Sequence, residues 1–361
     1  MSLKDNVYFL GLGCAGGKLH KEFIKMNYKG GAANGSEQDL KALGDVPTKY
    51  KLNGFDGFGG KRDKAIDCLT QNADFMNFVE NIKEDIVFVL FGGGGSTGSG
   101  CATLLSELLV QNVDEYGYPL KTVCPVIALP SADEPIVKHS NAYQAVCELQ
   151  NIEGLGATFF INNDVSSDYD YINSNFARML DTFLSNDSYG TLNNFDESER
   201  MEMLKDNGAM VFSLISNDKK RSLMLDKLTR SGIFAPIESN GVCENIGILH
   251  SGSNQSDILP DEVVAEVGKP NNIFEGYNAK CTLIAVSGLD YPVSHVSKLG
   301  ELAQKAFDER QRNRSQTTRK KLEGLSFMDV DAEKTKLNTE MKKCTSKFEV
   351  MRRKQQEKLK Q

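Results

Sequence analysis

The residues Phe91–Gly100 read FGGGGSTGSG and follow directly on the apolar run Ile86–Leu90. Glycine inside a regular element costs roughly 0.5–1 kcal/mol relative to alanine, so glycines gather where the backbone must turn sharply or approach another group. Placed between a buried strand and a helix expected over Cys101–Val110, such a turn lets backbone N–H groups converge on an anion. The alternative is a flexible surface loop, but linker composition rarely stands immediately after a buried strand.

Apolar, β-branched runs alternate with helical patterns along the first half of the chain. This alternation predicts an α/β fold with a mainly parallel, Rossmann-like sheet and helices on both faces. Ligands of such sheets bind beyond the carboxyl ends of the strands. The expected strands are Val7–Leu12, Ile86–Phe91, Thr122–Leu129 and Ala157–Ile161, and the expected helices are Lys18–Met26, Lys61–Ile82, Thr103–Val110 and Ser140–Gln150.

The second half begins with a long helix, Ile172–Leu184, whose apolar residues recur on one face. After Asn207 the pattern changes, and a second, smaller α/β unit is expected. From His295 an apolar stripe predicts a long C-terminal helix, and a last helix is expected from about Ala332. The strands expected in the second unit are Ala209–Ile215, Ile246–Leu249, Val263–Val267 and Cys281–Ser287.

The formal charge of −7 conceals an uneven distribution. From Lys305 onward there are 17 basic and 9 acidic residues, a balance of +8, against 25 basic and 40 acidic ones elsewhere, a balance of −15. An acidic body therefore carries a basic tail. The eight cysteines are scattered without a CxxC pair, which favours reduced thiols over a disulfide framework or a zinc site. No apolar run is long enough to span a membrane and no signal-peptide pattern opens the chain, so a cytoplasmic protein is expected.

A second glycine-rich turn, Gly11–Lys18, reads GLGCAGGK and also joins a strand to a helix. It matches the GxGxxG of dinucleotide-binding folds, but Ala32-Ala33-Asn34 stand where such folds place a ribose-binding acid. It also departs from the GxxxxGK[ST] phosphate loop, because Leu19 replaces the magnesium-binding hydroxyl. Two glycine turns on one sheet instead indicate a phosphate chain held from two sides.

The segment Gly94–Gly100, GGSTGSG, resembles the GGGTGSG signature of the tubulin/FtsZ superfamily, with Ser96 at the one position that differs. Segments resembling the superfamily's other nucleotide loops occur in the same order along the chain. The resemblance implies binding of GTP and GDP. The nucleotide contacts it implies are Gly11, Gly13, Cys14, Ala15, Gly16, Asn34, Gly59, Gly60, Gly94, Gly95, Ser96, Thr97, Gly98, Ser99, Glu134 at the ribose, Asn163 at the base, and Phe176 stacked on the guanine.

Downstream of the long helix, Asn194–Glu199 reads NFDESE and resembles the NxDxxD loop of FtsZ. By local chemistry alone this is a helix cap, since Asn194 and Asp196 are good capping residues. The resemblance implies instead that Asn194, Asp196 and Glu199 form a catalytic loop. In that family the acids reach the nucleotide of the next subunit in a filament, where they position the attacking water.

The resemblance thus implies a GTPase activated by polymerisation into head-to-tail filaments, with Mg²⁺ held mainly through phosphates and water and with no metal-ligating residues. The basic tail makes the chain most similar to the TubZ group, which segregates plasmid or phage DNA through a DNA-binding adaptor protein on a centromere-like site. The implied parts are a GTP-binding domain (1–170), the central helix and catalytic loop (171–207), a second domain (208–292), a long C-terminal helix (293–322) and a basic tail (323–361).

Three alternatives remain. An FtsZ-like cytoskeletal GTPase would have the same site and no role in DNA partition. A Rossmann-type, NAD-dependent oxidoreductase would use the GxGxxG turn. The chain lacks the ribose-binding acid of such enzymes, however, and this function would leave the second glycine turn unexplained. A non-catalytic scaffold with a degenerate nucleotide site would have no need of Asp196 and Glu199.

Overall fold

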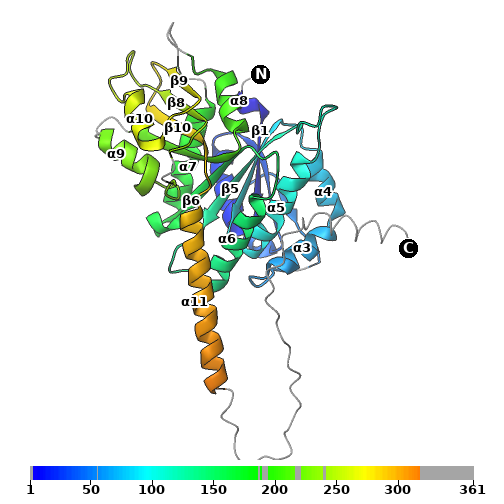
Figure 1. The fold of residues 1–361 in the computed structure, drawn as a ribbon. Coiled ribbons are helices and arrows are strands. Elements are labelled where there is room, and N and C mark those ends of the chain that lie inside the picture. The colour runs from blue at the N-terminus through cyan, green and yellow to red at the C-terminus, as the bar shows by residue number, and fades with distance from the viewer. Residues whose placement is uncertain are drawn as a thin grey trace, which may run out of the picture.

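The computed structural model describes residues 3–54, 56–185, 188, 194–215, 221–238 and 241–317. Within these residues, ten strands form one sheet in the order β3-β2-β1-β4-β5-β6-β7-β10-β8-β9 (Figure 1). Strands β3 to β7 run parallel, while β10 is antiparallel to both β7 and β8. The strands are β1 Val7–Leu12, β2 Lys29–Asn34, β3 Lys49–Lys51, β4 Ile86–Gly92, β5 Thr122–Leu129, β6 Ala157–Asn162, β7 Gly208–Ile215, β8 Asn245–Leu249, β9 Asn272–Gly276 and β10 Thr282–Leu289.

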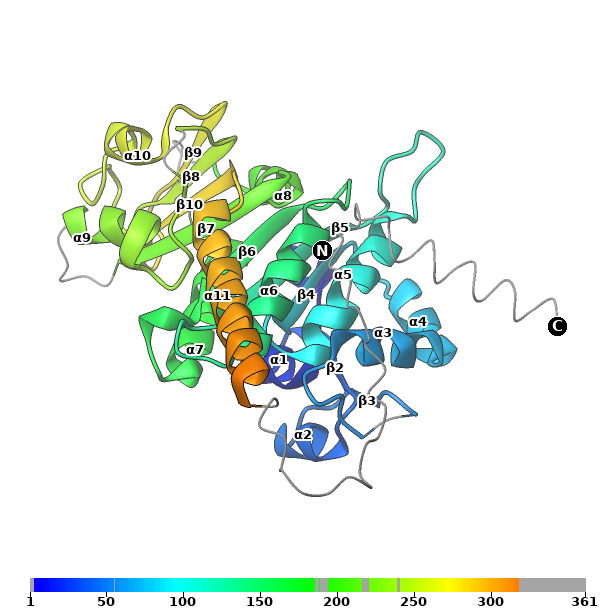
Figure 2. The same ribbon diagram turned by 60° about the horizontal axis from the view of Figure 1, so that its bottom comes forward.

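Helices cover both faces of the parallel half (Figures 1 and 2). Helix α1 packs on β1, β2 and β4 and against α7, whereas α3, α5 and α6 form the layer on the other face, with α11 against α6. The helices are α1 Gly13–Lys25, α2 Glu37–Ala42, α3 Arg62–Thr70, α4 Ala73–Glu80, α5 Ser96–Val110, α6 Ile136–Leu149, α7 Tyr169–Leu184, α8 Glu197–Lys205, α9 Arg221–Asp226, α10 Pro260–Val267 and α11 Val293–Thr317. The predicted α/β fold, with its long central helix and C-terminal helix, is confirmed.

The core forms where the central strands are covered on both faces. All seven residues of β4 are buried, which is why this strand reads as a continuous apolar run in the sequence. Phenylalanine rings join the sheet to the helices around it: Phe9 of β1 stacks on Phe23 of α1 with centroids 3.7 Å apart, and Phe159 of β6 meets Phe176 of α7 at 5.5 Å. Burying each such ring contributes about 1.5–3 kcal/mol to stability.

Two of the predicted elements are wrong. The strand expected over Val263–Val267 is part of helix α10, because Pro260 stands at the first helical position and Asp261 and Glu262 lie in the first turn. The single helix expected over Lys61–Ile82 is two helices, α3 and α4. Between them the buried amide of Asn72 donates to the carbonyls of Cys68 and Asn53 and accepts from the Asn53 backbone, which holds the chain in a turn.

Strand β2 reads KGGAAN and was not predicted, because glycine and alanine have little preference for strands. Its glycines are required by packing: a β-carbon on Gly30 would lie 2.4 Å from Nε2 of His20 in α1. Small residues here let α1 approach the sheet closely, and α1 begins at the candidate site.

The sheet continues from the first half of the chain into the second. Residues Ala157 and Thr158 of β6 pair in parallel with Gly208 and Ala209 of β7. Beyond β10, α11 packs on α6 and then extends away from the body (Figure 1). The helix expected from Ala332 and the tail 323–361 lie outside the described residues. Of the helices that the structure describes, none combines the length and the apolar character needed to cross a membrane.

Candidate functional site

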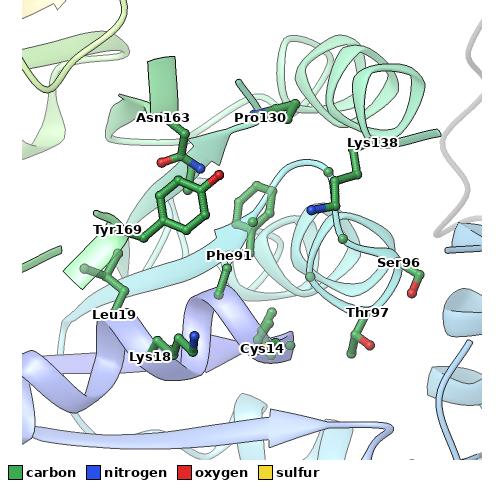
Figure 3. A pocket seen from close by; sticks show the side chains of 18 of the residues that line it. Cys14, Lys18, Leu19, Phe91, Ser96, Thr97, Pro130, Lys138, Asn163 and Tyr169 are labelled. Atoms are coloured by element: carbon green, nitrogen blue, oxygen red, sulfur yellow. The ribbon is translucent and has the colours of Figure 1, made fainter. Parts of the chain in front are cut away.

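A cavity of about 370 Å³ lies beyond the carboxyl ends of β1, β4, β5 and β6 (Figure 3). The strand–helix turns that follow these strands form its walls, as expected for a ligand site in a parallel sheet. The predicted binding residues that line it are Gly13, Cys14, Ala15, Asn34, Gly94, Gly95, Ser96, Thr97, Gly98, Glu134 and Asn163.

The two glycine turns meet on the floor of this cavity. Gly13 adopts a φ of +71°, which side chains rarely take, and a β-carbon there would lie 3.0 Å from the backbone nitrogen of Gly98. Helices α1 and α5 begin at Gly13 and Ser96, so both direct their unpaired N–H groups toward the same space. Converging helix N-termini form a site for an anion, and two of them suit a chain of phosphates.

Several glycines of the motifs serve packing and do not line the cavity. A β-carbon on Gly11 would lie 2.7 Å from the Gly16 carbonyl, and one on Gly16 would lie 2.1 Å from the Leu90 carbonyl. These glycines let α1 pass close to β1 and β4. Ser99, also predicted at the site, is fully buried, and its hydroxyl donates to the carbonyl of Gly95.

The loop that contains Gly59 and Gly60, both predicted at the nucleotide, lies beside the cavity and is not part of its lining. Gly59 and Gly60 have φ values of +57° and +78°. The buried amide of Asn141 in α6 donates to the carbonyls of both Gly60 and Gly94, at 3.1 Å each, and so fastens this loop to the second glycine turn. The adjacent Arg62 adds a second link, since its Nη2 donates to the Ser99 carbonyl at 2.6 Å and pairs with Glu148.

Glu134 and Tyr169 close one side of the cavity. The Tyr169 hydroxyl donates to Oε1 of Glu134 at 2.9 Å, and the Lys138 ammonium lies 3.0 Å from Oε2 of the same carboxylate. The neighbouring loops are joined as well, since the Asp164 carboxylate accepts from the backbone N–H of Ala132 at 2.7 Å. This arrangement presents a carboxylate and a ring at the site where a ribose and a base were expected.

The prediction for Phe176 does not fit its position. This ring is fully buried in α7 among Phe23, Phe159 and Phe234, so its side chain does not reach the cavity. The aromatic residue of α7 that lines the cavity is Tyr169, two turns earlier, and Asn173 lines it one turn further on. Tyr169 and Phe176 belong to the same helix, but Phe176 lies on its apolar face, which is turned toward the sheet.

Two lysines at the cavity were not predicted from the sequence as binding residues. Lys18 of α1 and Lys138 of α6 line the cavity from opposite sides (Figure 3). The four-residue spacing of Glu134 and Lys138 is a signal that could have identified Lys138. Near the floor, Thr97 donates to Oδ1 of Asn34 at 3.4 Å, and Nδ2 of Asn34 donates to Asp39 at 3.0 Å. Burial, and next the charge of Asp39, raise the pKa of the Cys14 thiol, so it is protonated at neutral pH.

The predicted catalytic loop Asn194–Glu199, the acid loop, has the geometry of a helix cap. The Asp196 carboxylate accepts from the backbone N–H of Ser198 at 2.8 Å, and Glu199 accepts from the backbone N–H of Asp196 at 3.0 Å. Asn194 accepts from the backbone N–H of Glu275 and donates its own N–H to the Glu275 carbonyl, which ties the loop to β9.

The acid loop lies near the amino ends of the central strands, and the cavity lies beyond their carboxyl ends. The acids stand at the start of α8. At its other end the Leu204 carbonyl accepts from the Cys124 thiol at the beginning of β5, and Glu197 accepts from the backbone N–H of Leu3 just before β1. The cavity is beyond the opposite ends of the same strands. An eight-residue strand such as β5 is roughly 26 Å long, far more than a carboxylate side chain can span.

Comparison with curated proteins gives tubulin-like relatives, although no protein-family model matches the chain. The tubulin-like protein TubZ of a Clostridium botulinum C phage is 24% identical over 339 residues, which cover 91% of each chain. The tubulin-like protein CetZ of Pyrococcus abyssi is 25% identical over 294 residues, covering 74% of this chain and 75% of the relative.

Solved structures agree at the level of the fold. The Clostridium botulinum phage c-st TubZ, with its C-terminal tail truncated, superposes with a TM-score of 0.74 at 24% identity and covers 85% of this chain and 99% of its own. The GTPγS-form protofilament of Bacillus thuringiensis serovar israelensis TubZ has a TM-score of 0.69 at 15% identity, covering 88% and 94%.

The chain therefore has the fold of the tubulin-like structures, and the resemblance to the tubulin/FtsZ superfamily that its motifs indicate is confirmed. Within that group, the chain is similar to phage TubZ along nearly its whole length.

Proposed function

We propose that this protein is a GTPase that assembles head to tail and hydrolyses GTP at the interface between subunits. The proposal rests on one observation: the cavity and the acid loop are separated by about the length of a central strand. One chain cannot bring both to the same nucleotide, whereas two chains in line can. A relative with the same fold is described as a GTPγS-form protofilament, which supports this arrangement.

The cavity residues would divide the work of binding. N–H groups of the two glycine turns, with Lys18 and Lys138, would hold the phosphates, and Glu134 would hold the ribose hydroxyls. Tyr169 would stack on the base, and the amides of Asn163 and Asn173 would read its polar edge. These amides offer both donors and acceptors, as guanine requires.

Mg²⁺ fits the floor of the cavity, because the Asp39 carboxylate there is an oxygen donor of the kind that this ion prefers. It would be held mainly through phosphates and water and would neutralise phosphate charge. Phosphoryl transfer needs little covalent help from the protein, but it needs an aligned water and stabilised charge. Asp196 and Glu199 of the neighbouring subunit would orient that water, so hydrolysis would follow assembly.

The role in DNA segregation is the finer part of the proposal. It rests on the similarity to phage TubZ and on the basic character of the chain from Lys305 onward. A DNA-binding adaptor protein, bound to a centromere-like site, would connect the filament to DNA. The described cysteines Cys14, Cys68, Cys101, Cys124 and Cys243 are free thiols, which suits the reducing cytoplasm in which such a filament would work.

The test is phosphate release from GTP, and from ATP in parallel, over a hundredfold range of protein concentration, with sedimentation of the same samples. We expect the rate per subunit to rise with concentration and to become constant once filaments sediment. A constant rate per subunit at concentrations where nothing sediments would show that the acids act within one chain, or not at all. Faster release from ATP would overturn the nucleotide assignment.

A further inference from the structure

Arg200 of α8 is fully buried and is the largest side chain in that state among the described residues. Removing a guanidinium from water is costly, and an apolar side chain of similar volume is often at least as stabilising in its place. A buried arginine therefore calls for an explanation from its contacts.

These contacts join two segments that are distant in the chain. Nη1 donates to the carbonyl of Ser185 at 2.7 Å, and Nη2 donates to the carbonyl of Phe195 at 3.3 Å. Ser185 caps the C-terminus of α7, where the helix dipole favours a positive charge, and Phe195 immediately precedes Asp196. The guanidinium carbon also lies 5.1 Å from the centre of the Phe195 ring, a cation–π contact.

The acid loop is thereby fixed from two sides. The Asn194 side-chain oxygen accepts from the backbone N–H of Glu275 in β9, and the Asn194 N–H donates to the Glu275 carbonyl. The buried Phe195 ring packs against Phe183 and Phe274. Arg200 holds the other side against the end of α7. Asp196, in contrast, is exposed. The anchors lie inside the molecule, and the acid faces outward from a loop of defined shape.

We propose that Arg200 is a positioning residue for Asp196 and Glu199, which it holds in the orientation that the neighbouring subunit's nucleotide requires. The inference rests on the proposed function. Arg200 is buried and would touch neither the nucleotide nor the attacking water. It acts through the Phe195 carbonyl, one residue from Asp196, and through the α8 backbone, one residue from Glu199.

The first measurement compares Arg200→Met and Arg200→Lys with the wild type, using Arg178→Met on the exposed face of α7 as the control. We expect kcat for GTP to fall at least tenfold in Arg200→Met, while GTP affinity and the sedimenting fraction change less than twofold. Lysine has a single nitrogen and cannot serve two carbonyls as a guanidinium does, so Arg200→Lys should be intermediate. Arg200→Lys also retains the buried positive charge, so the comparison can still be made if Arg200→Met fails to fold.

The second measurement separates positioning from a general loss of structure. Subunits with Gly98→Val should bind no nucleotide yet present intact acids, so adding them to Arg200→Met subunits should restore hydrolysis at least fivefold. Gly98→Val subunits that also have Arg200→Met should restore nothing. Equal restoration by both, or wild-type kcat in Arg200→Met and Arg200→Lys, would overturn the assignment of Arg200. If the wild type itself shows no rise in rate with assembly, the proposed function fails instead.

Discussion

Gly13 faces Gly98 across the floor of the cavity so closely that a β-carbon on Gly13 would lie 3.0 Å from the Gly98 nitrogen. This contact joins turns that are 85 residues apart in sequence, one after β1 and one after β4. Because β1 and β4 are parallel neighbours, their turns end at the same edge of the sheet. The space between the two turns is where we expect the phosphates to bind.

We predict that Gly13→Ala weakens GTP binding at least tenfold, measured by nucleotide retention or fluorescence titration. The new methyl group would approach the Gly98 backbone, and the φ of +71° would strain the alanine by roughly 1–2 kcal/mol. The matched control is Gly117→Ala, which has a φ of +88° but open space around its β-carbon. Both variants should lose similar stability, and only Gly13→Ala should lose affinity. Equal affinity in the two would remove Gly13 from the site.

The sequence predicts the glycine turns well, and it does not distinguish their roles. GxGxxG and GGSTGSG contain glycines that face the cavity, such as Gly13, and glycines that face another element, such as Gly16 against Leu90. Both kinds of glycine occur in one short motif, because the start of one helix must approach the ligand and also pack closely on the sheet. Only the three-dimensional arrangement shows that Gly11, Gly16 and Ser99 lie outside the cavity.

Helix α7 supplies a test of the corrected base contact. Tyr169→Ala should weaken GTP binding at least fivefold with little change in melting temperature, because this ring is 40% exposed at the cavity. Phe176→Ala should instead lower the free energy of unfolding by about 3–5 kcal/mol, the usual cost of removing a buried ring. Titration of affinity and denaturant unfolding of both variants decide the matter. Loss of affinity in Phe176→Ala without loss of stability would restore the original assignment.

The buried position of Phe176 shows what periodicity can establish. A spacing of 3.6 residues identifies the apolar face of α7, and Phe176 belongs to it. The stripe itself predicts burial against the sheet, and only a resemblance of position suggested contact with a base. Tyr169 and Asn173 lie in the first turns of α7, at the cavity end, and the sequence pattern gave no information on where that helix begins relative to the ligand.

The acid loop allows a catalytic and a capping role at the same time. Asp196→Ala and Glu199→Ala should each reduce GTP hydrolysis at least tenfold while GTP binding and filament assembly persist, giving filaments that turn over slowly. Each also removes one half of the capping box and should cost about 0.5–2 kcal/mol of stability. Glu262→Ala is the control, since Glu262 accepts from the backbone N–H of Leu259 at the start of α10. Wild-type turnover in either acid variant would leave that residue only as a cap.

His20 should make stability depend on pH. Its ring is fully buried beneath β2, and neither nitrogen has a hydrogen-bond partner among the described residues, so burial lowers its pKa to about 4. The unfolded chain takes up this proton near pH 6.5, while the folded one resists until about pH 4. Stability is therefore retained above pH 6.5 and lost as pH falls toward 4, by about 3 kcal/mol at most.

The measurement for His20 is denaturant unfolding at pH 8 and pH 5 for the wild type and for His20→Leu. The difference in unfolding free energy between the two pH values should be smaller in His20→Leu by more than 1 kcal/mol. An unchanged difference would mean that other groups account for the acid sensitivity. His139→Gln serves as the comparison, because Nε2 of His139 contacts the Ser131 carbonyl, whereas neither ring nitrogen of His20 has a partner among the described residues.

The basic tail should be dispensable for nucleotide chemistry and necessary for recruitment. Truncation at Leu322 removes residues 323–361, where Leu337, Met341, Cys344, Phe348 and Met351 recur at helical spacing among basic residues. A helix of that length is marginal alone in water, so it should order on a partner, and its charge should make docking sensitive to salt. We expect unchanged GTP affinity in the truncated protein, with lost recruitment of the adaptor–DNA complex or altered filament bundling. Co-sedimentation at low and high salt measures both, and identical recruitment and filament form with and without the tail would assign it no part in either.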